Sequence, residues 1–319
     1  MRQYILRRLL LFIPSIIGAS LGIFLLLRII PGDIAALILS GDSGESDYTQ
    51  EEVEELRHEL GLDKNVLVQY GDWVWGMMRG DMGTSFLDNY PVSKTLRERF
   101  PRTMQLGALT LAVILIIAVP IGILAALKQD TFVDYILRGV AIIGLAAPSF
   151  WVGLMVVLIL SKWFNYFPPL GFVNLWDDPK VGIQQLIFPA AALGFAINGL
   201  LLRIMRAQLL EVLREDYVRT ARAKGLRERV VVMRHAVRNA MLPVVTVMGF
   251  LVAGLLSGSV AIELIFGIPG MGQTLIQAVR LRDLPIVEGF VLFVVVLYLV
   301  INLVIDISYA WLDPRVRYD

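Results

Sequence analysis

The stretch Arg214-Glu-Asp-Tyr-Val-Arg-Thr-Ala-Arg-Ala-Lys-Gly-Leu226 is a short polar segment between two long apolar runs, Leu186–Leu202 and Met241–Ile262. A helix that crosses a membrane needs roughly 17 to 25 mostly apolar residues, so each flanking run is long enough to span one. A basic segment held between two spans predicts a surface that docks a protein outside the membrane.

The polar stretch itself predicts a helix. Asp216 can cap a helix whose first turn begins at Tyr217, and Gly225 can supply the left-handed residue that ends it. An apolar stripe is expected at Tyr217, Val218, Ala221 and Leu226, with a wet basic face opposite. The small residues Ala221 and Ala223 are expected to let a partner surface approach closely.

Composition places the whole chain in the membrane class. Of its 319 residues, 57% are hydrophobic and 18% charged, against about half apolar and about a quarter charged in soluble domains. The net charge of +1 excludes bulk attraction to nucleic acid. The chain has no cysteine, hence no thiol nucleophile, disulfide or zinc thiolate. Two distant histidines, His58 and His235, make a metal or catalytic site improbable. These features predict a membrane protein that is not an enzyme.

Apolar runs predict an all-α, multi-pass cell-membrane protein with six spans, the first of which is a retained span and not a cleaved signal peptide. The runs are Leu9–Leu27, Met104–Leu127, Val133–Leu160, Leu186–Leu202, Met241–Ile262 and Val287–Trp311. Prolines inside these runs, among them Pro14, Pro120, Pro148 and Pro189, predict kinks. Glycine pairs spaced four apart, Gly18–Gly22 and Gly254–Gly258, predict close helix packing.

Basic residues set the expected orientation. They cluster before the first span, throughout the connection between the fourth and fifth spans, and after the last span. An even number of spans puts all of them on one side, which the positive-inside rule makes the cytosol. Both termini are then cytosolic, as is a connecting loop over residues 207–240. The first span covers about 9–30 and the others lie within 102–312 of a single 1–319 membrane domain.

The outward-facing segment 31–101 predicts a small helical cap. Thr49-Gln-Glu-Glu52 has the form of a capping box, and Gly61 fits the end of that helix. Further helices are expected at Val66–Arg79 and Val92–Phe100. Two interpretations stay open: a lid that packs on the loops, or a contact surface or gate for an extracytoplasmic partner.

Asp216-Tyr-Val-Arg-Thr-Ala-Arg-Ala-Lys-Gly225 resembles the cytosolic loop of ABC importer permeases of type I, in the peptide/nickel subclass. The resemblance extends over the chain through Leu27–Asp33, Gly80–Phe86, Ala147–Trp151, Arg234–Ala240, Leu242-Pro243, Phe266–Gly272 and Leu312–Arg315. It is similar to the first permease subunit of dipeptide and oligopeptide importers. Arg219-Thr-Ala221 stands where the generic loop has Glu-Ala-Ala, and the spacing from the glycine to Leu-Pro is longer; both departures look like the peptide subclass.

This resemblance implies an importer component that forms half of a translocation pathway. Its implied partners are a second homologous permease, one or two cytosolic ATPases that bind ATP and magnesium, and an extracytoplasmic substrate-binding protein; no cofactor is implied for this chain. The loop helix would insert into a cleft of the ATPase. The residues implied in this coupling are Asp216, Tyr217, Arg219, Thr220, Ala221, Arg222, Ala223, Lys224 and Gly225.

The chain does not carry its own nucleotide site. Gly267–Gly272 has the glycine spacing of a phosphate loop, but Gln273 replaces the essential lysine and no strand is expected before it. Energy must therefore come from a partner.

Polar groups in the spans are candidates for a translocation path: Asn198, Ser257, Ser259, Glu263 and Asn302. For the charges near span ends, including Arg28, Asp134, Arg138 and Glu288, pairing or snorkelling is the favoured explanation. Few charges lie within the spans, so specificity is expected to reside in the binding protein. A secondary carrier or channel without an ATPase stays open, as do nickel, glutathione, dipeptide and oligopeptide substrates.

Overall fold

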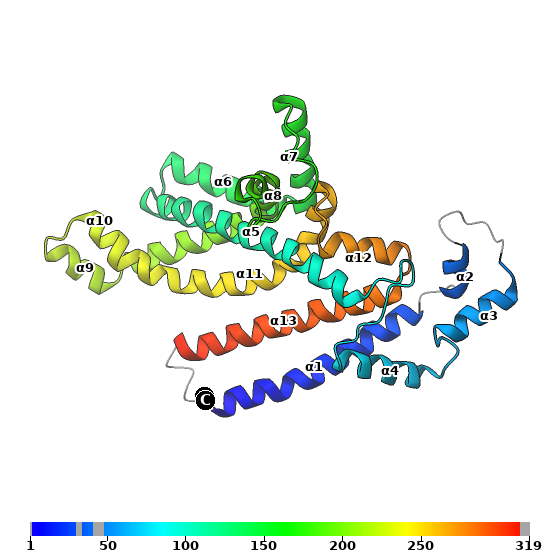
Figure 1. Cartoon of the computed structure of the whole chain (residues 1–319). Helices are drawn as coiled ribbons and strands as arrows, with labels where there is room; N and C mark the ends of the chain where they lie inside the picture. Colours follow the sequence, from blue (N-terminus) through cyan, green and yellow to red (C-terminus); the bar gives the residue numbers. More distant parts are fainter. Residues whose placement is uncertain (1, 30–33, 41–47, 313–319) are drawn as a thin grey trace. The chain divides into compact units, whose positions relative to one another are not determined.

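The computed structural model describes residues 2–29, 34–40 and 48–312, and the regular structure in these ranges is helical apart from one bridge between Thr84 and Pro91 (Figure 1). The all-α prediction is therefore confirmed. The chain divides into two compact units, residues 1–100 with 274–319, and residues 101–273. Parts of two predicted motifs, residues 30–33 and 313–315, lie outside the described ranges.

The first unit contains the helices from both ends of the chain. They are α1 (Arg2–Ile29), α2 (Ile34–Ser40), α3 (Gln50–Glu59), α4 (Val66–Met78), α13 (Leu284–Leu312), the start of α5 (Val92–Leu127) and most of α12 (Met271–Arg280). Helices α1 and α13 pack together, blue and red in Figure 1. Arg28 Nη1 lies 2.7 Å from Glu288 Oε1 and its guanidinium covers the Phe24 ring. For these two charges, pairing, one of the two explanations expected from the sequence, is confirmed.

The capping box of α3 is confirmed in both directions. The Thr49 hydroxyl accepts the Glu52 N–H at 3.3 Å, and the Glu52 carboxylate accepts the Thr49 N–H at 2.7 Å. Gly61 has φ +65°, as its role at the helix end requires. The predicted helix at Val92–Phe100 is confirmed as the first part of α5, which continues through Pro101 to Leu127. A proline removes one backbone hydrogen bond, and this loss does not end α5.

A buried carboxylate organises the Gly80–Phe86 motif. Asp283, just before α13, accepts a hydrogen bond from the Ser85 hydroxyl at 2.6 Å and from the Phe86 N–H at 3.2 Å. Burial raises the pKa of Asp283 above its usual value, and the Ser85 hydrogen bond opposes that rise. A Cβ built at Gly83 would lie 3.8 Å from Pro285 Cβ. The φ of +76° at this position favours glycine. The motif thus connects the segment before α5 to the start of α13.

The second unit is built around a long central helix, α8 (Pro179–Val212), which packs against α6, α7 and α11. Its other elements are α6 (Phe132–Ala146), α7 (Ser149–Phe164), α9 (Asp216–Ala223), α10 (Glu228–Val230), the π-helix η2 (Val231–Ala236), α11 (Val237–Phe266) and the rest of α5. Leu201, Met205 and Leu209 of α8 are fully buried in one apolar core, and Leu186 and Leu193 belong to a second. The predicted connection at 207–240 emerges from the first of these cores.

The helices bend sharply at two places, one inside a predicted span and one just after another predicted span. The run Val133–Leu160 is two helices, α6 and α7, at 108°. Pro148 has no N–H to donate, and the preceding Ala147 is extended at ψ 124°, as residues before proline tend to be. The second bend, of 85°, separates α11 from α12 at Gly267, whose φ is +66°. Pro14, Pro120 and Pro189 lie inside continuous helices, so only Pro148 of the four breaks its run.

Close helix packing uses glycines other than those expected. A Cβ built at Gly199 of α8 would collide with the backbone carbonyl of Ala141 of α6. By contrast, no described heavy atom comes within 4 Å of a Cβ at Gly18, Gly22 or Gly254, so for these the packing prediction is wrong within this chain. The fourth, Gly258, is confirmed, with Leu193 at 3.3 Å.

Within the described ranges, four helical stretches are long and apolar enough to cross a membrane, or up to six if each bent pair counts as one span. The four are Val92–Leu127, Pro179–Val212, Glu228–Leu251 and Leu284–Val304; α1 adds a shorter apolar helix, Leu10–Leu26. The chain is therefore an integral membrane protein by length and composition.

Candidate functional site

Helix α9 is the predicted docking helix, and it begins one residue earlier than expected. Glu215 is the extended N-cap residue and Asp216 is already helical, so the prediction that Asp216 caps the helix is wrong. The Asp216 carboxylate instead lies in the first turn, where the positive end of the helix dipole stabilises its negative charge. Its Oδ1 lies 3.5 Å from Arg219 Nη1. The predicted end is confirmed: Lys224 is the C-cap and Gly225 follows with φ +75°.

The apolar stripe of α9 faces its own chain. Val218 is fully buried and Ala221 is 7% exposed, and both pack against Val231 of η2, with Val212 and Leu213 at the edge. The stripe was therefore predicted correctly at its two central positions. Leu226 is 42% exposed and lies outside it. The Ala221 side chain fills the contact with η2, and its expected role in coupling stays a prediction.

Tyr217 and Asn239 make a second connection between α9 and α11. Tyr217 is 42% exposed, and its hydroxyl accepts a hydrogen bond from the Asn239 amide nitrogen at 2.7 Å. Sequence reasoning did not find Asn239, since the two residues are 22 positions apart. The same Asn239 amide bonds the His235 carbonyl at the end of η2.

The basic face of α9 is partly committed to internal pairs. Arg222 donates to the Glu228 carboxylate through Nη2 at 2.8 Å and Nε at 3.2 Å, and the hydrogen bond to Glu228 raises the pKa of Arg222. Arg222 also reaches the Leu213 carbonyl at 3.4 Å. Thr220, Ala223 and Lys224 are exposed. The outward face of α9 is thus polar, and its inward face is small and apolar.

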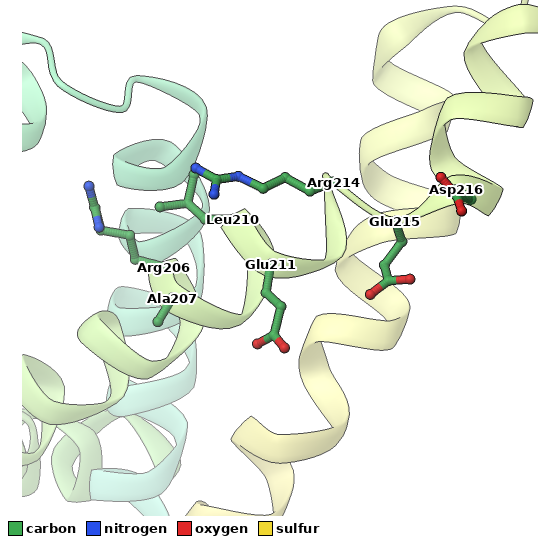
Figure 2. A pocket seen from close by; sticks show the side chains of 7 residues that line it. All are labelled: Arg206, Ala207, Leu210, Glu211, Arg214, Glu215 and Asp216. Carbon is green, nitrogen blue, oxygen red and sulfur yellow. The ribbon is translucent and has the colours of Figure 1, made fainter.

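A hollow of about 590 Å³ opens beside the start of α9. Figure 2 shows the Arg214 side chain extending back along α8, whereas Glu211 and Glu215 point the other way. The hollow is lined by Arg206, Ala207, Leu210, Glu211, Arg214, Glu215 and Asp216. It mixes both signs of charge at the junction of α8 and α9, and it is open to the surface.

Arg206, which lines this hollow, holds a buried ion pair between α8 and α6. Its Nε and Nη2 lie 2.8 and 2.7 Å from the two oxygens of Asp134, whose side chain is fully buried. Arg138 adds a longer contact of 3.6 Å, and the Asp130 N–H donates to the same carboxylate. Pairing, one of the explanations expected for the charges of Asp134 and Arg138, is confirmed. The main partner of Asp134 is Arg206.

Removing one member of this pair should destabilise the fold. We expect Asp134→Ala to lower the free energy of unfolding by about 3–5 kcal/mol, because Arg206 is then left without its counter-charge in a largely buried site. Thermal unfolding of the purified chain in detergent measures the change. Adding Arg206→Met should recover most of the loss. An equal loss in the single and double variants would contradict the pair's importance.

The candidate path residues are divided between the two units. Asn198 lies on α8, and its buried side-chain oxygen has no described partner. Ser259 is 2% exposed on α11. Asn302 is on α13 in the other unit, and the side chain of Ser257 lies outside what is described.

Glu263, the remaining candidate, is fully buried and holds the bend between α11 and α12. Its carboxylate accepts the Thr103 hydroxyl at 2.7 Å and the Gln273 N–H at 3.1 Å. A Cβ at Gly270 would come within 2.6 Å of this carboxylate, so the glycine leaves room for it. The Phe266–Gly272 motif is therefore a turn that folds around the Glu263 carboxylate. Its glycines at 270 and 272 leave room for that carboxylate, which a larger residue would not.

Comparison with known proteins accounts for nearly the whole chain. Residues 118–318 match the family described as "Binding-protein-dependent transport system inner membrane component", and residues 1–107 match its N-terminal family. The chain belongs to this family of inner membrane transport components. The permease therefore resides in a membrane and serves a transport system.

Several relatives align with the permease from end to end. A Brucella abortus (strain 2308) protein is 40% identical over 319 residues, covering all of both chains. The dipeptide transport system permease protein of Escherichia coli K12 is 39% identical, covering 100% of this chain and 99% of its own. The oligopeptide transport system permease protein of Bacillus subtilis is 36% identical, with both chains fully covered.

Proposed function

We propose that this permease is one half of the translocation pathway of an ATP-driven ABC importer for dipeptides or oligopeptides. The observation that carries the proposal is α9, a short helix with its apolar side seated on its own chain and a polar side exposed. Full-length alignment with permeases named for dipeptide and oligopeptide transport supports peptides as the substrate class. The same names do not favour a carrier, a channel, or nickel and glutathione as cargo.

In this proposal, six spans place both termini and α9 in the cytosol. Partner ATPases, one kind or two, bind ATP and magnesium and dock on α9, and a second homologous permease completes the pathway. The outward coupling residues are Asp216, Tyr217, Arg219, Thr220, Arg222, Ala223 and Lys224, with Ala221 and Gly225 setting the helix in place. An extracytoplasmic binding protein delivers the peptide.

The path residues proposed are those on α8, α11 and α13: Asn198, Ser257, Ser259, Glu263 and Asn302. Asn198 is supported by its unsatisfied buried oxygen, which a substrate or water could reach only if the helices part. Glu263 acts through the bend that it holds. Low charge along the spans supports weak selectivity here, with specificity in the binding protein.

Transport by the reconstituted complex tests the function. The permease, its partner permease and the ATPases are placed in proteoliposomes, and uptake of labelled di- and tetrapeptides is followed with and without ATP and the binding protein. We expect uptake to require both. Uptake without ATP would identify a carrier or channel instead, and micromolar or tighter peptide binding by the permease pair alone would contradict the assignment of specificity to the binding protein.

A further inference from the structure

Helix α4 packs one side against the second half of α1, as Figure 1 shows within the first unit. The Tyr70 hydroxyl lies 2.8 Å from the Ser20 hydroxyl, and the Tyr70 ring meets Phe24 edge-on at 5.2 Å. Trp73 adds a third ring, 5.8 Å from Phe24. This side of α4 is anchored by aromatic packing and one hydrogen bond.

The opposite side of α4 is apolar and exposed. Residues 67, 71, 75 and 78 follow helical spacing along that side. Leu67 is 77% exposed, Trp75 54% and Met78 67%. A helix that is apolar on both sides needs an apolar environment for the side that its own protein leaves uncovered.

The depth of this contact is set by α1. Ser20 and Phe24 lie within the apolar stretch Leu10–Leu26, whereas the Arg28–Glu288 pair marks its end. At 1.5 Å per residue, Ser20 is about 12 Å along the helix from Arg28. Because Tyr70 bonds Ser20 and Gln69 bonds Arg28, α4 lies at the level where the apolar part of α1 gives way to charge.

The neighbouring surface of α1 is also apolar and exposed. Leu21 is 40% exposed, Leu25 41% and Leu26 66%, as expected for a membrane helix that turns apolar side chains to lipid. Lys64 precedes α4 and Arg79 follows it, the latter covering the Trp75 ring. The exposed Asp72 in the middle of α4 pairs with Lys64 at 3.4 Å. Tryptophan and basic residues at the edges of an apolar face are typical of helices in the membrane interface.

We propose that the exposed face of α4, Leu67 with Trp75 and Met78, lies in the boundary between headgroups and acyl chains at the end of α1. The occupant is bilayer lipid, because α4 packs against the apolar stretch of α1 near its charged end and its three exposed apolar side chains form no cluster of charges for a soluble partner. The segment between α1 and α5 is then held to the membrane, in contrast to a free lid. This inference does not depend on what the permease transports.

Single-cysteine spin labelling tests the placement, and the sequence suits it because the chain has no cysteine. The variants are Leu67→Cys and Met78→Cys, with Glu55→Cys on the exposed side of α3 as the matched control. Each labelled permease is assembled with its partners in lipid vesicles. Relaxation of the label by oxygen, which concentrates in lipid, is compared with relaxation by a water-soluble nickel chelate.

Labels at 67 and 78 should be relaxed several-fold more by oxygen than by the chelate, with the reverse at 55. Two results would overturn the proposal. One is chelate access at 67 and 78 equal to that at 55, which would place this face in water. The other is protection from both reagents that ends when the binding protein or the second permease is left out, which would identify a protein as the occupant. All three positions are exposed, so the substitutions themselves should leave the fold intact.

Discussion

Replacing Ala221 by arginine should reduce ATP-driven peptide uptake by at least about tenfold. Ala221 is 7% exposed and packs with Val218 against Val231, so an arginine there must either bury an unpaired charge or lift α9 off its seat. Burial of an unpaired charge costs several kcal/mol, and about 1.4 kcal/mol already corresponds to a factor of ten. Uptake by proteoliposomes that contain all partner subunits measures the loss.

The matched control is Ala223→Arg, the same change two residues further along the same helix but at an exposed position. In the isolated permease, Ala221→Arg should speed proteolytic cleavage around residues 213–227, whereas Ala223→Arg should leave cleavage as in the wild type. If α9 docks on an ATPase, both variants should lower uptake. Normal uptake by Ala221→Arg with unchanged membrane insertion would refute the role of α9.

Replacing Gly199 by leucine should destabilise the second unit strongly. A Cβ at this position collides with the Ala141 carbonyl, a backbone atom of α6 that cannot rotate away. Overpacking of a core costs about 1–3 kcal/mol, and we expect the upper end or more, because two helices must separate to admit the side chain. The melting temperature of the isolated permease in detergent, followed by its monodisperse fraction after heating, reports this loss.

Gly139→Leu is the comparison for that experiment. Gly139 lies on α6, the helix that Gly199 contacts, yet no described atom comes within 4 Å of its built Cβ. Leucine there should leave the melting temperature unchanged or raise it, since glycine inside a helix is unfavourable by roughly 0.5–1 kcal/mol relative to alanine. Similar losses at both positions would mean that helix propensity, and not the α6–α8 contact, dominates.

Local patterns predicted local structure well. The Thr49–Glu52 capping box, the glycine ends at Gly61 and Gly225, and the buried Val218–Ala221 stripe all occur in the structure. These features depend on residues only a few positions apart, whose interactions the helix geometry fixes. The cap of α9 was misplaced by one residue because Glu215 and Asp216 are adjacent carboxylates, and spacing alone does not tell which backbone is extended.

Long-range contacts could not be predicted in the same way. The spacing of Gly18 and Gly22 describes one face of a helix but not which helix approaches it, and the close contact is made by Gly199 with α6 instead. Likewise, four prolines look alike in the sequence, yet only Pro148 breaks its helix. The partner of Asp134 is 72 residues away, and its identity as Arg206 required the fold.

The two faces of α9 have different surroundings. Val218 and Ala221 are matched to η2 of the same chain, whereas Arg219, Ala223 and Lys224 face outward. In the proposed complex, exchanging only the outward residues for those of another permease would direct binding to a different ATPase while the helix keeps its position. On the proposed docking role, the choice of ATPase and the placement of the helix are expected to be separable, which would make α9 an exchange point for building hybrid transporters.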